Sequence, residues 1–138
     1  MRWRWALALV LLAGCGLRQS LLQPPVPPAP PGATEVGSKR CADCHEEIYK
    51  SFRRSVHARA ASFETGLKGG CESCHGPGSL HVEEGDPGKI RSFARLSPAE
   101  EAAVCVQCHR TGDLMNWSGS AHAMAEVGCT RCHSIHKA

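Results

Sequence analysis

Eight of the nine cysteines in this 138-residue chain occur as four copies of one five-residue pattern, and this repetition constrains the fold more than any other feature. In each copy, two residues separate two cysteines, and a histidine directly follows the second cysteine. The copies are Cys41-Ala-Asp-Cys44-His45, Cys71-Glu-Ser-Cys74-His75, Cys105-Val-Gln-Cys108-His109 and Cys129-Thr-Arg-Cys132-His133. Whatever binds to them must therefore occupy much of the folded part of the chain.

The pattern C-x-x-C-H is that of c-type haem attachment. Two thiols one helical turn apart can form thioethers with the two vinyl groups of a haem, and the adjacent histidine is then directed at the iron. We expect four covalently bound c-type haems as cofactors, with the eight cysteines as attachment points. The expected proximal iron ligands are His45, His75, His109 and His133.

Zinc ribbons and disulfide frameworks also use closely spaced cysteines. Neither of them requires a histidine after every second cysteine, and neither needs four further histidines. An export signal at the N-terminus disfavours zinc further. Haem attachment is the better interpretation of the pattern.

Four histidines lie outside the pattern, as many as there are expected irons: His57, His81, His122 and His136. Their placement follows an internal repeat. Each half of the chain contains an attachment site, a short Ser-x-His-Ala segment (55–58 and 120–123), a second site and one more histidine. We expect these histidines to be the distal ligands of bis-histidine haems, with Met115 and Met124 as the available thioether substitutes.

Spacing limits the pairing of these ligands but does not settle it. His136 follows His133 by three residues, a reach of at most ~11 Å, so it should serve a haem other than the fourth. His81 follows His75 across Gly76-Pro77-Gly78 and could turn back to its own haem only with strain. The partners of His57 and His122 stay open, because each could fold back or reach a neighbouring haem.

The N-terminus resembles a lipoprotein signal peptide. Two arginines precede the apolar run Ala6–Ala13, and Leu12-Ala13-Gly14-Cys15 resembles a bacterial lipobox. We expect residues 1–14 to be removed and Cys15 to be lipidated, which accounts for the ninth cysteine. A non-lipidated signal peptide and a membrane anchor are the alternatives, but the apolar run is shorter than the ~20 residues that span a bilayer. In having Gly16 rather than aspartate directly after Cys15, the chain resembles lipoproteins that are sorted to the outer membrane.

Residues 15–38 carry the lipidated cysteine and a proline-rich linker. The segment Gln23–Gly32 reads QPPVPPAPPG and holds six of the nine prolines. Such a segment adopts polyproline II at ~3.1 Å per residue, which predicts a spacer of roughly 30 Å. We expect it to hold the haem domain, residues 39–138, clear of the membrane. A ligand for a proline-recognising domain is the less favoured alternative.

The chain has seven aromatic residues, too few for an ordinary core. Ser97-Pro98-Ala99-Glu100 is a capping box that predicts a helix running into the third site, and a second helix is expected from Cys41 towards Ala60, with charged pairs along it. Glycine-rich segments predict turns at 66–70, 76–78 and 85–88. The predicted fold class is mainly α, with short helices and loops wrapped around four haems and no significant β-sheet.

From Cys41 onward the chain resembles the multihaem c-type cytochromes, typified by the decahaem periplasmic components of outer-membrane electron conduits and by pentahaem electron donors to periplasmic nitrite reductase. The four attachment sites carry this resemblance, together with the runs 75–81, 115–122 and 133–136. It implies low-spin, closely spaced haems used for electron transfer. The chain departs from these relatives in having four sites and its own lipid anchor, so the identity of the partners does not follow.

These features together predict an electron carrier rather than an enzyme, in a respiratory chain of the periplasm or cell envelope. The expected partners are other cytochromes, a membrane quinol-linked donor or a terminal reductase, and the membrane itself through the lipid. The alternative is a small reductase of the nitrite or hydroxylamine type with one open-coordinate haem. The net charge of +3, without a basic run, argues against nucleic acid as a partner, and eight haem propionates would make the loaded protein acidic.

Overall fold

The computed structural model describes residues 25–62 and 70–137, so the predicted signal peptide and Cys15 lie outside the described residues. Within these ranges the chain forms short helices and no strand, which confirms the mainly α fold class. The α-helices are α2 (Ser38–Ala42), α3 (Glu46–Phe52), α4 (Val56–Ser62), α5 (Glu72–His75), α6 (Ser79–Glu84), α7 (Pro98–Cys105) and α8 (Ala121–Met124). The 3₁₀ helices are η1 (Pro87–Lys89), η2 (Phe93–Arg95), η3 (Gly112–Gly119) and η4 (Cys129–Arg131). None of the helices in these ranges has the length and apolar character needed to cross a membrane.

Helix α7 begins as its sequence predicts. The Ser97 hydroxyl accepts a hydrogen bond from the Glu100 backbone N–H at 3.3 Å, and the Glu100 carboxylate accepts one from the Ser97 N–H at 2.8 Å. Pro98 occupies the first helical position, where its missing N–H costs nothing. The capping box is confirmed, and the helix it starts ends at Cys105, the first cysteine of the third site.

The predicted continuous helix from Cys41 towards Ala60 is wrong, because the chain divides there into α2, α3 and α4. His45 leaves the helical conformation (φ −114°, ψ 44°), so the first attachment site itself ends the first helix. The Ser55 hydroxyl then accepts a hydrogen bond from the Ala58 N–H at 3.1 Å, an N-cap interaction that starts a new helix. Of the expected charged pairs, Lys50 contacts Glu46 at 2.8 Å and Glu47 at 3.2 Å.

Two of the predicted turns are present. Gly76 (φ +73°) ends α5, and Gly85 (φ +70°) ends α6 in the left-handed conformation that glycine adopts without strain. The third predicted turn, 66–70, lies outside the described residues except for Gly70. These turns let consecutive short helices change direction without a long connection.

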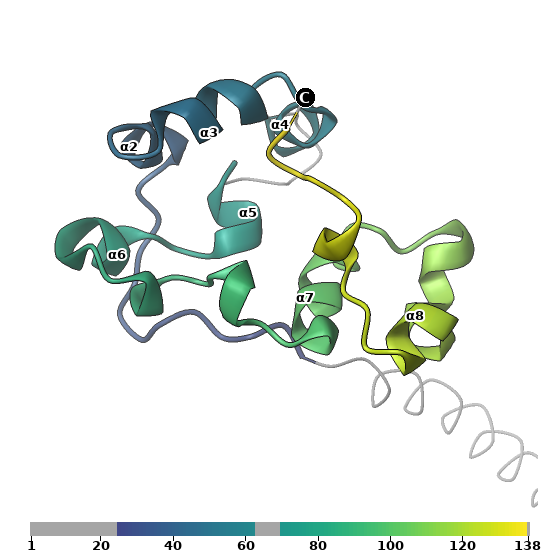
Figure 1. Ribbon diagram of the computed structural model, residues 1–138. Helices are drawn as coiled ribbons and strands as arrows, with labels where there is room; N and C mark the ends of the chain where they lie inside the picture. Colours follow the sequence, from purple (N-terminus) through teal and green to yellow (C-terminus); the bar gives the residue numbers. More distant parts are fainter. Residues whose placement is uncertain (1–24, 63–69, 138) are drawn as a thin grey trace, which may run out of the picture.

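The described part of the proline-rich linker lies against the folded part instead of standing clear of it (Figure 1). The Pro27 carbonyl accepts a hydrogen bond from the Arg91 guanidinium at 2.7 Å. The Thr34 N–H donates to the Ser79 hydroxyl at 2.9 Å, and the Ser79 N–H donates back to the Thr34 carbonyl at 3.1 Å. Residues 25–37 therefore form a strap along the domain and do not act as a spacer that stands clear of it.

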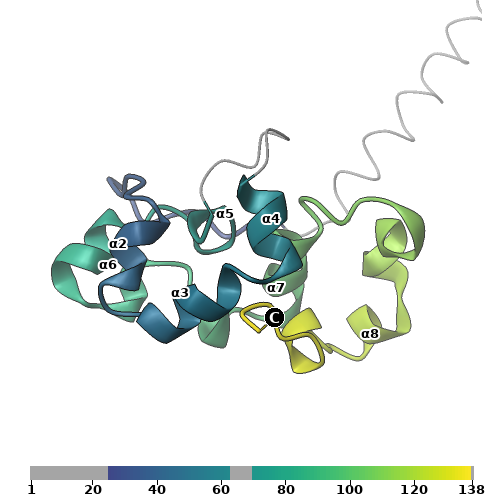
Figure 2. The ribbon, with the colours of Figure 1, turned by 90° about the horizontal axis from the view of Figure 1, so that it is seen from above.

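The protein core is very small. Among the described residues, the buried hydrophobic side chains are three consecutive residues of α7 (Ala102, Ala103 and Val104) together with Ala58 of α4. No large side chain among the described residues is fully buried. Figure 2 shows α7 near the middle of the molecule, with the C-terminal segment lying close to α4 and α7. A chain with so little buried apolar surface needs another source of stability.

Candidate functional site

The four attachment sites share one pattern of backbone hydrogen bonds. In every site the histidine N–H donates to the carbonyl of the first cysteine, at 2.8, 3.0, 3.2 and 2.9 Å for His45, His75, His109 and His133. The N–H of the second cysteine also donates to the first cysteine's carbonyl, at 3.2–3.3 Å in all four. Each pentapeptide is thus a single helical turn, which brings its two thiols to the same side of the chain as haem attachment requires.

Thiols of different sites lie next to one another. Burial and the neighbouring Cys71 thiol, to which it is hydrogen-bonded, raise the pKa of Cys41 to about 11. Burial and the Cys129 thiol likewise raise the pKa of Cys105 to about 12. Burial, followed by the charge of Cys108, raises the pKa of Cys74. Hydrogen bonds between thiols therefore join the first site to the second and the third to the fourth, while the second and third sites interact through charge.

Three of the extra histidines each lie beside a histidine of an attachment site. The ring centroids of His45 and His81 are 6.3 Å apart with an interplanar angle of 13°, and those of His75 and His136 are 5.8 Å apart at 19°. The His57 and His109 centroids are 6.1 Å apart at 55°. The structure therefore brings together residues that spacing alone left unpaired. His136 adjoins the second site, whereas its spacing from His133 predicts only that it does not serve the fourth.

These separations fit a shared metal ion. With metal–imidazole bonds of about 2.0–2.1 Å and a ring nitrogen ~1.1 Å from its centroid, two imidazoles trans on one ion have centroids about 6 Å apart. All three pairs lie close to that value. By contrast, the described residues contain no group of three or more His, Cys, Asp or Glu side chains arranged to hold a metal ion directly. This donor set fits a haem iron better than a zinc site.

Two of these imidazoles are held by their Nδ1 atoms. His75 Nδ1 is 2.9 Å from the Arg91 carbonyl oxygen, and His81 Nδ1 is 2.9 Å from that of Asp86. A carbonyl oxygen only accepts, so Nδ1 carries the proton and Nε2 keeps its lone pair for a metal. Such second-shell contacts orient metal-binding histidines and fix their tautomer.

Burial favours the neutral imidazole at two of the three pairs. Burial lowers the pKa of His75, against the opposing effect of its hydrogen bond to the Arg91 carbonyl. Burial, with a smaller effect of His109, also lowers the pKa of His57. Only the neutral ring can bind a metal ion, so both shifts act in the direction that ligation needs.

The second pair has an aromatic environment. The ring of Phe93 meets that of His75 edge-on with centroids 5.3 Å apart, and the ring of Phe52 meets that of His136 at 6.3 Å. Three separate parts of the chain, around residues 52, 75 and 136, are therefore brought together at this one site.

The two Ser-x-His-Ala segments form the same local structure. Ser55 and Ser120 each use their hydroxyl to accept a hydrogen bond at 3.1 Å from the N–H three residues on, that of Ala58 or Ala123. Each segment thus begins a short helix, α4 or α8, with its histidine in the first turn. The internal repeat seen in the sequence is a repeat of structure.

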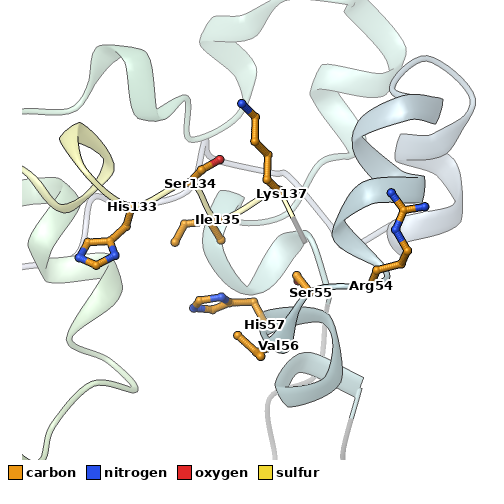
Figure 3. Close-up of a pocket in the computed structure, with 8 residues that line it drawn as sticks. All are labelled: Arg54, Ser55, Val56, His57, His133, Ser134, Ile135 and Lys137. Carbon is orange, nitrogen blue, oxygen red and sulfur yellow. The ribbon is translucent and has the colours of Figure 1, made fainter.

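The fourth site differs from the other three. Among the described residues, no imidazole lies beside His133 in the way that one lies beside each of the other three attachment-site histidines. The remaining extra histidine, His122, lies parallel to Trp117, with ring centroids 6.0 Å apart. His133 instead lines a cavity of about 290 Å³. Figure 3 shows His133 and His57 on this cavity, whose other lining residues are Arg54, Ser55, Val56, Ser134, Ile135 and Lys137.

Arg91 is a site residue that the sequence gave no reason to single out. Its guanidinium donates to the carbonyls of Cys74 at 2.8 Å and Pro27 at 2.7 Å, while its buried Nε has no partner within the described part of the chain. A buried donor without an acceptor is costly. The haem propionates would supply anionic acceptors, so this orphaned donor also fits a haem bound at the second site.

Comparisons with known proteins identify the family of the chain. Residues 71–138 match the model of the NrfB-like cytochrome c-type proteins, and residues 40–69 match that of cytochrome c554 and c-prime. Together the two matches include all four attachment sites. The chain belongs to the multihaem c-type cytochromes. Membership implies covalently bound c-type haem.

This cytochrome is also similar to larger proteins. It is 33% identical over 108 residues to the multiheme cytochrome MtrA of Shewanella baltica (strain OS185), an alignment that covers 74% of this chain and 32% of the relative. It is 28% identical over 138 residues to the C-type polyheme cytochrome OmcB of two Geobacter sulfurreducens strains, covering 89% of this chain and 17% of the relative. The cytochrome thus spans about a third or less of the length of these curated relatives. No solved structure matches it.

Proposed function

We propose that this cytochrome is an electron carrier with four c-type haems, each held between two histidines. The observation that carries the proposal is the set of three imidazole pairs with centroids 5.8–6.3 Å apart. Every pair joins a histidine of an attachment site to one outside the pattern. By elimination, His122 is the proposed distal ligand for His133 at the fourth site.

The order of the sites supports a relay. Hydrogen bonds between thiols connect Cys41 to Cys71 and Cys105 to Cys129, and the charge of Cys108 acts on Cys74 between the second site and the third. The four sites therefore form a series in the order of the sequence. Electron transfer between neighbours requires short edge-to-edge distances, and attachment points whose thiols lie this near one another favour them.

The chemistry that bound haem would supply is the one-electron Fe(III)/Fe(II) couple. At the first three sites the paired histidines would hold the haem iron between them, and His122 would complete the fourth, which would leave no position for a substrate. The Arg91 and Asp86 carbonyls hold His75 and His81 in one orientation, which limits the rearrangement that accompanies a change of charge. This arrangement is suited to moving electrons and unsuited to making or breaking bonds at iron.

We place the protein outside the cytoplasm, in the periplasm or cell envelope, anchored by a lipid on Cys15 and favouring the outer membrane. The lipobox-like segment and Gly16 support this placement. The similarity to multiheme cytochromes supports other cytochromes as redox partners in a chain of anaerobic respiration, with a quinol-linked donor or a terminal reductase at its ends.

One observation favours a second candidate function, a small reductase with one open haem. His133 lines a cavity and is not part of an imidazole pair within the described residues. If His122 does not reach the fourth iron, that iron has a free axial position. A nitrite- or hydroxylamine-type reductase would need such a position.

Carbon monoxide distinguishes the two. A carrier with four bis-histidine haems should take up four electrons per chain from dithionite, and its reduced absorption spectrum should not change promptly when carbon monoxide is added. The measurement is anaerobic stopped-flow spectroscopy of the loaded protein. Prompt binding at one haem per chain would exclude the pure carrier and support the reductase.

A further inference from the structure

Two glutamates are buried next to the attachment sites, and the proposed function uses neither of them. Glu72 follows Cys71 and is only 6% exposed. Its carboxylate accepts hydrogen bonds from the backbone N–H groups of Gly78 at 2.8 Å, Gly37 at 2.8 Å and Val36 at 3.0 Å. It thereby fastens the strap to the second site.

Glu101 is buried to the same degree in the other half of the chain, at 6% exposure. It projects from α7 onto the fourth site, where it accepts hydrogen bonds from the Thr130 N–H and, at 3.0 Å, from the Thr130 hydroxyl. A Cβ atom added to Gly128 would come within 2.7 Å of its Oε2 atom. The carboxylate therefore packs against the residues on both sides of Cys129.

The two carboxylates occupy matching places in space, each beside the first cysteines of two neighbouring attachment sites. Glu72 adjoins the contact between Cys41 and Cys71, the first cysteines of sites one and two, and its charge is among the causes that raise the pKa of Cys41. Glu101 adjoins the contact between Cys105 and Cys129, the first cysteines of sites three and four, and its charge contributes to the raised pKa of both. They come from different positions in the sequence, so only the fold makes them equivalent.

Neither carboxylate is neutralised by a cation. Within the described part of the chain, no lysine or arginine forms an ion pair with Glu72 or Glu101. Every contact named above brings an N–H or O–H donor to the carboxylate, an environment that suits the ionised acceptor. A charge buried without a counter-ion is costly, and it acts on its neighbours with little screening.

We propose that Glu72 and Glu101 are redox-tuning residues, fixed negative charges that lower the reduction potentials of sites one and two and of sites three and four respectively. Reduction adds one electron to one iron and removes one unit of positive charge. A nearby carboxylate stabilises the ferric state more than the ferrous state, so it makes reduction harder. At the second site the cationic Arg91 lies beside Cys74 and opposes the effect of Glu72. The effect of a carboxylate on the potentials is therefore easier to isolate at Glu101.

The test is a spectroelectrochemical titration of the fully loaded protein, and it rests on the proposed function. In Glu101→Gln, two of the four one-electron transitions should move to more positive potential. Glu101→Asp, which keeps the charge, should stay closer to the wild type. Glu83→Gln is the matched control, because Glu83 is an exposed carboxylate of α6 and its replacement should leave all four transitions in place.

Thr130→Val separates a charge effect from a structural one. It removes a hydroxyl that donates to Glu101 and leaves the carboxylate in place, so potentials should move in the negative direction, opposite to Glu101→Gln. Unchanged potentials in Glu101→Gln with four haems attached, or shifts of the same sign in both variants, would overturn the inference while leaving the carrier function intact. A wild-type protein with fewer than four attached haems would instead contradict the proposed function. If Glu101→Gln does not acquire its haems, the reduction potentials of Thr130→Val and Glu101→Asp test the inference instead.

Discussion

Made without haem attachment, the chain is expected to be unfolded. Ordering a chain costs roughly 1–2 kcal/mol of conformational entropy per residue. Against this cost the described residues bury only Ala58, Ala102, Ala103 and Val104 as hydrophobic side chains, and no large side chain fully. The α-helices of the described residues are four to eight residues long, too short to be stable alone. The covalent haems and their axial ligands would then provide most of the folding energy, as metals do in small metalloproteins.

Circular dichroism measures this directly. Residues 25–138, which include the strap, should lack a cooperative thermal transition and show little helical signal when made in cells without cytochrome c maturation. The same residues loaded with haem should show both helix and a cooperative transition. The loaded domain is the control for the expression and purification steps. A haem-free chain with native-like helix content and cooperative unfolding would show that the protein core suffices.

Replacing His136 by alanine should open one iron. His136 lies beside His75, 5.8 Å between centroids, and these residues are far apart in the sequence. We expect His136→Ala to keep four attached haems but to convert one of them to a high-spin form, which binds one carbon monoxide per chain when reduced. The thermal midpoint should also fall, because the link between the C-terminus and α5 is lost. Absorption spectroscopy with and without carbon monoxide tests this.

Lys137→Ala is the matched control for this experiment. It changes the next residue, which lines the cavity beside His133 and carries no iron-binding group. This variant should retain the low-spin spectrum and should not bind carbon monoxide. If His136→Ala also stays entirely low-spin, His136 is not an axial ligand and the pairing with His75 is wrong.

Local features of this fold could be predicted from the sequence. The capping box at Ser97 and the turns at Gly76 and Gly85 depend on residues a few positions apart, and the structure contains them. The helical turn of each attachment site is equally local. The break at Ser55 has a local signal too, since serine is a preferred N-cap residue and its hydroxyl can start a new helix. The charged pairs along 46–54 favour a continuous helix and hide that signal.

Long-range features could not be predicted. The pairing of His57 with His109 and of His75 with His136 depends on how the two halves of the chain fold together, and spacing only excluded some choices. Arg91 and Glu101 gave no sequence signal, since an isolated charged residue is most often exposed. The contacts of the strap could not be predicted either. A proline-rich composition indicates a stiff segment, but it does not show which donors on a neighbouring surface its carbonyls will meet.

The intact mass of the purified protein, taken together with its haem absorption spectrum, tests the central claim most directly. The account predicts a chain that carries four covalently attached haems, with the ferrous spectrum of low-spin c-type haem. The same mass reports whether residues 1–14 are absent and Cys15 is lipidated. A mass equal to that of the bare polypeptide, or a haem count other than four, would contradict the account.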